Sequence, residues 1–374
     1  MLAYNKQDLT NAFIRKQMKK AAKSETISEA ENKQISIAYP VRFYSPNIFI
    51  RIGLGIVIIT ACSALASFAD SLIKSISVMP YILLLISVML FMSLEYFIKK
   101  YHHYRSGIDD VLLYAALTFL YGSLTVSQLN TWKYFDLLIS LVMTLTGILA
   151  VIRYSDRLVT LLAYFSGMYF AGALIFKAGI VPKQALPLLI ILICFTVYLS
   201  AKRYKLRPAF WHYFNCLFIL EIFSLPCIYI AGNYFVASIW WNEQFSSALS
   251  TNNWKYFFIA ITSLMPIWCL LTGIHMHDLV RLRWSVLMTA ASVITFHYYM
   301  ELISIEAEMI MYGIFLIIAA YILIRRLKSG IQGYTYNPLE DSSGMIELEE
   351  LFIGGSFSSE SKPRESTLKD EQAS

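Results

Sequence analysis

The stretch that decides the fold reads LLISLVMTLTGILAVI and runs from Leu137 to Ile152 without a charged side chain. Together with the residues from Tyr134 onward, it is long enough to cross the ~30 Å hydrocarbon layer of a bilayer, which takes about 20 helical residues. Apolar and polar residues do not alternate along it, as they would in a strand of a membrane barrel. Backbone polar groups in lipid must be satisfied within the segment, so we predict a transmembrane α-helix.

Segments of the same kind recur along most of the chain. They predict an all-α, polytopic integral membrane protein with ten transmembrane helices. The ten segments are Asn47–Phe68, Val78–Phe97, Val111–Gln128, Tyr134–Ile152, Leu158–Phe176, Ala185–Ala201, Phe210–Ile230, Trp254–Ile274, Trp284–Met300 and Met309–Ile324.

The composition excludes several other classes of protein. Of 374 residues, 57% are hydrophobic and only 15% are charged, whereas a soluble domain carries about 25% charged residues. This excludes a soluble enzyme, a disordered chain and a secreted disulfide scaffold. The cysteines lie singly in apolar segments and are odd in number, so we expect five small core residues and neither a metal site nor a cofactor.

The basic residues predict the orientation of the spans. With the N-terminus in the cytoplasm, 26 of the 31 Lys and Arg residues fall on the cytoplasmic side of the ten spans. This bias follows the positive-inside rule, so both termini are predicted to be cytoplasmic. It also accounts for the net charge of +6 without any contact to nucleic acid. The first 46 residues are polar, which excludes a cleavable signal peptide and makes the first span an uncleaved anchor.

Three regions follow from this pattern: a basic helical segment over residues 1–46, a ten-span bundle over 47–326 and a disordered tail over 327–374. In the first region, a second short helix is expected to begin at Ser28, with Glu31 completing a capping box, and to end before Pro40. The preceding helix carries four lysines on one face, at positions 16, 19, 20 and 23. This pair of helices either docks a cytoplasmic protein partner or lies on anionic lipid headgroups. The acidic and apolar run Met345–Ile353 either folds on a partner or packs against the basic inner surface.

Glu221 is the candidate coupling or binding carboxylate. It stands about eleven residues into the seventh predicted span, roughly 16 Å deep at 1.5 Å per residue, and Pro226 follows it. Proline has no N–H, so it leaves the carbonyl of Ile222 without its helical donor. Polar groups at a broken helix near the midplane are typical of solute and ion sites in transporters. Alternatively, a protonated Glu221 bonds a hydroxyl of a neighbouring helix and holds the bundle together; the candidate hydroxyls belong to Thr262, Ser263, Ser292 and Thr295.

A second candidate site lies at the outer end of the ninth span. His297 and Glu301 are four residues apart, so they share one helix face, and Glu306 and Glu308 follow. Together they are suited to a divalent cation or a proton relay. The alternative is a solvated outer rim.

Histidines also gather on the inner side, in the run from Tyr101 to Arg105 and in the run from His275 to Asp278. Either cluster suits a phosphate or a lipid headgroup, or is simply a solvated loop. Neither is accompanied by a catalytic motif. On the outer side, Gly232 to Asn253 is expected to be the longest loop between spans.

The N-terminus also carries a resemblance. The run from Lys23 to Glu31 leads through Ala38-Tyr39-Pro40 to Tyr44-Ser45-Pro46-Asn47. Over about residues 1–60 this looks like uncharacterised bacterial membrane proteins that place a short I-S-x-E helical segment before many spans. The resemblance implies the class and the topology, and no activity. We expect the membrane to be a bacterial cytoplasmic membrane. The drug/metabolite transporters share ten spans and inside termini, which is an analogy of fold only.

Three hypotheses of function remain at this point. The first is a small-solute carrier that uses Glu221. The second is a non-transporting membrane scaffold or sensor that acts through the N-terminal hairpin and the tail. The third is a lipid-linked enzyme that uses the inner His and Arg loops, and the missing catalytic motifs argue against it. The expected partners are the lipid bilayer, a small solute or cation, and a cytoplasmic protein at the termini.

Overall fold

The structure is a computed structural model. It describes residues 2–23, 27–72, 78–127, 131–179, 185–205, 207–245, 253–275 and 278–300, together with residues 182, 249, 310, 313, 314, 317 and 321. In this part of the chain the fold is all-helical, and the one β contact is a single bridge between Tyr44 and His103. The elements are α1 (Lys6–Lys23), α2 (Glu29–Ala38), α3 (Ile48–Leu72), α4 (Met79–Tyr101), α5 (Ile108–Val126), α6 (Phe135–Tyr154), α7 (Arg157–Ala178), α8 (Leu186–Lys205), the 3-10 helix η3 (Pro208–Tyr213), α9 (Phe214–Gly232), α10 (Tyr234–Phe245), α11 (Trp254–His275) and α12 (Leu279–Met300).

Eight helices are long and apolar enough to cross a membrane: α3 to α9, the last taken together with η3, and α11. They match the first eight predicted segments and confirm a multi-pass membrane protein. α12 coincides with the ninth predicted segment and is long enough, but Arg281, Arg283 and its hydroxyl side chains make it less apolar than these eight. The tenth segment and the tail lie outside the described residues, apart from single positions in Met309–Ile324.

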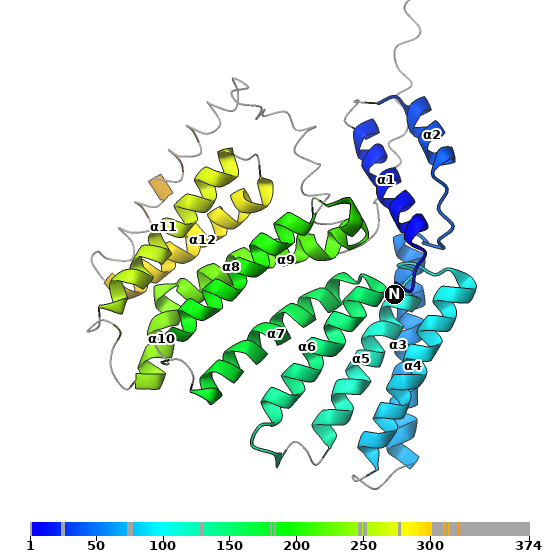
Figure 1. Cartoon of the computed structure of the whole chain (residues 1–374), viewed down its shortest axis with the longest axis horizontal. Helices are drawn as coiled ribbons and strands as arrows, with labels where there is room; N and C mark the ends of the chain where they lie inside the picture. Colours follow the sequence, from blue (N-terminus) through cyan, green and yellow to red (C-terminus); the bar gives the residue numbers. More distant parts are fainter. Residues whose placement is uncertain are drawn as a thin grey trace, which may run out of the picture.

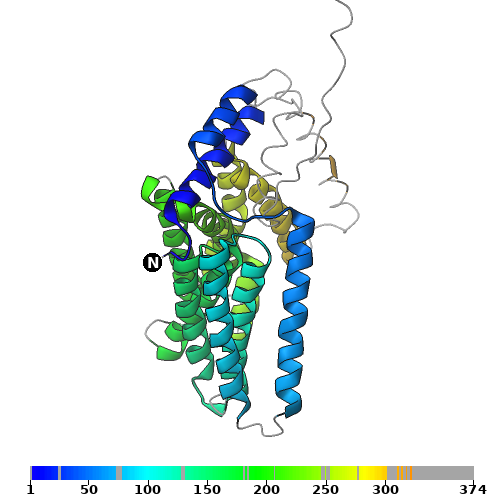
Figure 2. The same ribbon diagram turned by 90° about the vertical axis from the view of Figure 1, so that its right-hand side faces the viewer.

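The membrane-spanning helices associate as hairpins, in which consecutive helices lie side by side: α4 with α5, α6 with α7, α8 with α9, and α11 with α12 (Figure 1). The α6–α7 pair shows why such helices pack closely. A Cβ on Gly147 would come within 2.8 Å of the Cβ of Ala163, so the absence of a side chain at Gly147 lets the two backbones approach. α3 stands beside this array and packs mainly on α5 (Figure 2).

The two N-terminal helices lie at one end of the bundle and extend beyond it, and we call this end the N-terminal end (Figures 1 and 2). The predicted capping box is confirmed. The hydroxyl of Ser28 accepts from the backbone N–H of Glu31, and the Glu31 carboxylate accepts from the backbone N–H of Ser28 at 2.8 Å. α2 ends at Ala38, two residues before Pro40. Tyr4 and Leu9 are buried with residues of α4 and α5, so the N-terminal segment is part of the core.

The expected loop from Gly232 to Asn253 is wrong, because α10 occupies Tyr234–Phe245. Asn233 is extended and separates α9 from α10, and its side-chain oxygen accepts from the backbone N–H of Phe235 at 2.8 Å. This bond caps α10. All five cysteines are free thiols and four of them are buried, as expected.

Candidate functional site

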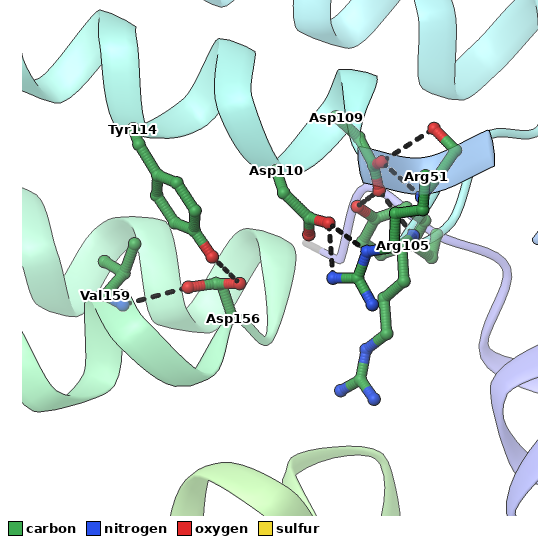
Figure 3. A network of polar contacts seen from close by, with 9 residues as sticks. Arg51, Arg105, Asp109, Asp110, Tyr114, Asp156 and Val159 are labelled. Atoms are coloured by element: carbon green, nitrogen blue, oxygen red, sulfur yellow. Dashed lines mark hydrogen bonds and ion pairs between the residues drawn. The ribbon is translucent and has the colours of Figure 1, made fainter. Parts of the chain in front are cut away.

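A polar network fills the N-terminal end of the bundle, where α5 begins (Figure 3). Asp109, only 3% exposed, stands in the first turn of α5. Its carboxylate accepts from the backbone N–H groups of Arg105 and Ser106 at 2.7 and 2.8 Å and from the Ser106 hydroxyl at 2.9 Å. The hydroxyl of Tyr4 donates to the same carboxylate at 3.3 Å. Asp109 therefore fixes the α4–α5 turn and ties the N-terminal segment to it.

Two more carboxylates complete this network. Asp110 accepts from the Nε and Nη2 atoms of Arg51 at 3.1 and 2.6 Å, which joins α5 to the start of α3. Asp156 caps α7 by accepting from the Val159 N–H at 2.9 Å, and it also accepts from the Tyr114 hydroxyl at 2.9 Å. Each of the three acids is thus bound by groups of the protein itself.

Gly107 lets the α4–α5 turn approach α3. Its φ is +91°, and a Cβ there would collide with the backbone carbonyl of Arg51. Glycine alone adopts this conformation without strain and leaves that space empty. The Arg51–Asp110 ion pair forms beside this close approach.

α1 is held on this end by a few specific contacts. The backbone N–H of Ala3 donates to the carbonyl of Arg153 at 2.8 Å. The ring of Phe13 lies 5.4 Å from the rings of both Trp211 and Phe214. Burial, reinforced by Asp109, raises the pKa of Tyr4 well above 10, so its phenol stays a hydrogen-bond donor.

The described residues at this end enclose three cavities. One of about 350 Å³ is bounded by the N-terminal segment and the end of α4, with Asp8, Arg42, Lys99 and His102 among its lining residues. A second, of about 10 Å³, adjoins Asp109, Asp110 and Asp156. The third, of about 130 Å³, lies between α1, the Tyr104–Arg105 turn and the start of α9. We call this third space the α1 cavity.

Glu221 is buried in α9, 5% exposed, and forms an ion pair with Lys205, the last residue of α8. The sequence predicted this carboxylate near the midplane, either at a solute site or bonded to a neighbouring hydroxyl. In the structure its partner is the lysine at the end of α8. The expected hydroxyl partners bond elsewhere: Ser292 pairs with Tyr229 at 2.8 Å. Pro226 lies inside α9, as predicted.

Hydroxyl and amide groups of α9, α11 and α12 form a separate buried network around Asn233. The Asn233 amide donates to the hydroxyls of Tyr229 at 2.9 Å and Thr295 at 3.2 Å. Thr262 accepts from the backbone N–H of Tyr234 at 2.9 Å. The hydroxyl of Ser263 donates within its own helix, to the Ile259 carbonyl at 2.9 Å. Three of the four hydroxyls that the sequence offered to Glu221 thus hold the α9–α10 break in place.

A third buried charge lies beside Glu221. Arg281 of α12, 4% exposed, donates to the Tyr198 hydroxyl and forms an ion pair with Asp278 at 3.2 Å. Tyr198 is close enough to Glu221 for the two to interact electrostatically. The charged side chains of α8, α9 and α12 therefore lie near one another in this part of the bundle.

His297 stands half-buried in the last turn of α12. Its expected partners Glu301, Glu306 and Glu308 lie outside the described residues. Among the residues that are described, no three His, Cys, Asp or Glu side chains gather in a way that could hold a metal ion.

Sequence reasoning missed Lys205 as the partner of Glu221 and Arg105 as a wall of the α1 cavity. Lys205 carried a usable signal, since the α8–α9 hairpin brings the end of one helix beside the start of the next. Arg105 belonged to a cluster already singled out, but nothing in the sequence placed α1 or Trp211 beside it. Comparison with protein-family models, with curated proteins and with solved structures finds no match for the chain.

Proposed function

We propose that this protein is a non-transporting sensor or scaffold of a bacterial cytoplasmic membrane, with α1 as its movable element. The full arrangement has ten spans, with α12 as the ninth and Met309–Ile324 as the tenth. Both termini lie in the cytoplasm, so the N-terminal end of the bundle faces the cytoplasm. The distribution of Lys and Arg supports this orientation.

The observation that carries the proposal is the docking of α1 over the N-terminal end of the bundle. Leu9, 5% exposed, and Phe13 are its main apolar anchors. Burying such a side chain contributes about 1.5 to 3 kcal/mol. A ligand at 100 times its Kd contributes about 2.7 kcal/mol, so binding of a ligand is enough to move α1 between a docked and a released state.

Release of α1 would change what the protein presents to the cytoplasm. The lysine side chains at 16 and 19 belong to α1, and docking holds one face of that helix on the bundle. A released α1 presents this basic, amphipathic helix to an acidic protein or to anionic headgroups. The sensor or scaffold thus acts by exposing α1 to a partner in the released state and by holding it on the bundle in the docked state.

Hydrogen–deuterium exchange of the full chain in lipid nanodiscs tests this proposal. We expect the amides of α1 to exchange through local opening, far faster than the buried amides of α5. Phe13→Ala should accelerate exchange in residues 6–23 alone, and Gln7→Ala, at an exposed position of the same helix, should not. If α1 exchanges only as slowly as α5, it is a fixed part of the bundle and the proposal fails.

A small-solute carrier is the second candidate, and the buried Glu221–Lys205 pair beside Pro226 favours it. In that function the carboxylate would exchange Lys205 for a solute or a coupling ion. None of the three cavities described above is lined by Glu221, which is why we place the sensor first. A panel of ions and metabolites, scored by thermal stability, should give shifts that Glu221→Gln abolishes if the carrier proposal is right, and no such shift if it is wrong.

A further inference from the structure

The α1 cavity has an electrostatic character of its own. Its lining residues include two cations, Lys16 from α1 and Arg105 from the α4–α5 turn, and the side-chain amides of Gln17 and Asn215. None of its lining residues is acidic. The carboxylates of the neighbouring network line the small adjoining cavity instead. A space of about 130 Å³ with cations, amides and no carboxylate is suited to an anion.

Arg105 lies at the boundary between these two regions and lines both cavities. Figure 3 shows its side chain extending away from Asp109 and Asp110, and no dashed line ends on the guanidinium. Among the described residues, its one specific side-chain contact is with the ring of Tyr104, whose centroid lies 5.2 Å from Cζ. Burial acts to lower the pKa of this guanidinium, but Tyr104, Asp110 and Asp156 raise it above its ordinary value, so the charge persists.

The backbone of Arg105 supports a binding role. Its φ is +51°, in the left-handed region that residues other than glycine rarely adopt. The carboxylate of Asp109 holds it there, by accepting the Arg105 N–H at 2.7 Å. Strained residues of this kind cluster at ligand sites, where the surrounding structure maintains them. In this backbone conformation the side chain of Arg105, which carries five N–H donors, lines the cavity.

The start of α9 strengthens the same preference. Phe214 and Asn215, its first two residues, line the cavity. The side-chain amide of Asn215 can donate a hydrogen bond to an anion beside Lys16 and Arg105. The nearby guanidinium of Arg157 interacts with that of Arg105 as well.

We propose that the α1 cavity binds a phosphate group, held by Arg105 and Lys16 at the start of α9. A phosphate monoester carries close to two negative charges at neutral pH, which matches two cations better than a single carboxylate does. The planar guanidinium of Arg105 can donate two parallel hydrogen bonds to two phosphate oxygens. The phosphate belongs either to a free small molecule or to an anionic phospholipid headgroup at the membrane surface.

This inference rests on the proposed function in one respect, because Lys16 contributes to the site only while α1 is docked. A bound phosphate then favours the docked state by the difference between its affinities for the two states. The site would thereby give the proposed sensor its signal.

Inorganic phosphate, titrated calorimetrically into the full chain in zwitterionic phosphatidylcholine nanodiscs, tests the free form of the ligand. Ionic strength is held constant with chloride. Arg105→Gln should weaken binding by at least about tenfold, as expected for loss of charged hydrogen bonds, and Lys16→Gln by several-fold. Lys19→Gln is the matched control: the same change of charge on the same helix, at an exposed position that does not line the cavity. Equal weakening by all three variants would reveal charge screening alone and overturn the site.

Nanodiscs that contain phosphatidic acid, an anionic lipid whose headgroup is a phosphate monoester, test the lipid form. Slower exchange of α1 in this lipid, lost in Arg105→Gln and kept in Lys19→Gln, assigns the phosphate to a headgroup. If neither inorganic phosphate nor the anionic lipid gives a response that depends on Arg105, the inference is wrong. Lys16→Gln keeps the test valid if Arg105→Gln does not fold.

The two proposals fail in different ways. Phosphate binding that depends on Arg105, with no change in the exchange of α1, keeps the site and removes the sensor. Local opening of α1 without any phosphate response keeps the movable helix and removes the site.

Discussion

Glu221 and Lys205 face each other across the α8–α9 hairpin, with side chains only 6% and 19% exposed. Removing one partner of a buried pair costs about 3 to 5 kcal/mol, because the other charge stays buried alone. We therefore expect Lys205→Met to lower the free energy of unfolding by about 3 kcal/mol, and Glu221→Leu in the same chain to restore most of it. Reversible unfolding in mixed micelles measures both.

Lys99→Met is the control for this pair. Lys99 also faces a glutamate, Glu95, at 3.5 Å, but its side chain is 69% exposed. Exposed ion pairs contribute only about 0 to 1 kcal/mol. Equal losses in the two lysine variants would show that Glu221 is not held by a buried pair.

The sequence singled out Glu221 because a carboxylate inside an apolar segment is rare. It did not single out Lys205, because a lysine at the end of a span is common and serves as a signal for topology. The difference is physical, because the free energy of burying a charge is high in the middle of a membrane span and low near its end, where the side chain can reach water. Their pairing depends on how two helices are packed, which hydropathy does not encode.

The stability of helix α2 should depend on pH through its capping box. No residue of α2 is buried, so its capping box supplies much of its local stability. The backbone and hydroxyl of Ser28 lower the pKa of Glu31 below 4.5. A carboxyl whose pKa falls on folding stabilises the helix above its unfolded pKa, and this stability is lost as the pH falls through the folded value. The amides of residues 29–38 should therefore lose protection below about pH 4.5.

Ser28→Ala should lower the stability of α2 by about 1 kcal/mol and remove this dependence on pH. Ser36→Ala, in the last turn of the same helix, keeps the capping box and should keep the dependence. Exchange measured between pH 3.5 and 6, corrected for intrinsic rates, gives both results. An unchanged pH profile in Ser28→Ala would mean that the box does not hold α2.

Elements with a local signature were predictable, and α10 was not. Ser28, Glu31 and Pro40 mark both ends of α2 in the sequence itself. The start of α10 depends on Asn233, whose side chain caps this helix while it bonds Thr295 sixty-two residues away. Aromatic and aliphatic residues lie all around α10. The sequence therefore shows no separate polar and apolar faces that would mark this segment as a helix and not a loop.

The orientation of the whole molecule gives a prediction that needs no ligand. Gln7 and Lys133 are both exposed and are separated in the chain by α3, α4 and α5. An odd number of spans places them on opposite sides of the membrane. A membrane-impermeant maleimide should label Lys133→Cys in intact cells, and Gln7→Cys only after permeabilisation. The wild type, whose cysteines are mostly buried, gives the background. Labelling of both variants in intact cells would contradict this orientation.

At this scale the sequence predicted the eight apolar helices, because each needs only its own composition to be stable in lipid. It did not predict that α1 would share a core with α4 and α5. That contact depends on Tyr4 and Leu9, which are two ordinary apolar residues in a polar segment. The α1 cavity escaped prediction for the same reason, since its walls come from three regions distant in the chain.

The docking of Phe13 against Trp211 and Phe214 also imposes an order on biosynthesis. α1 is synthesised before its aromatic partners, which are translated about 200 residues later, after roughly 10 to 40 s at about 5 to 20 residues per second. The hairpins between them form from neighbouring segments and need not wait. This helix thus completes its native packing only after the start of α9 has been made. During that interval Phe13 is accessible to chaperones and proteases, whereas Leu9 can already pack against α4 and α5. Contact of Phe13 with its aromatic partners therefore marks a chain that has been completed at least as far as α9.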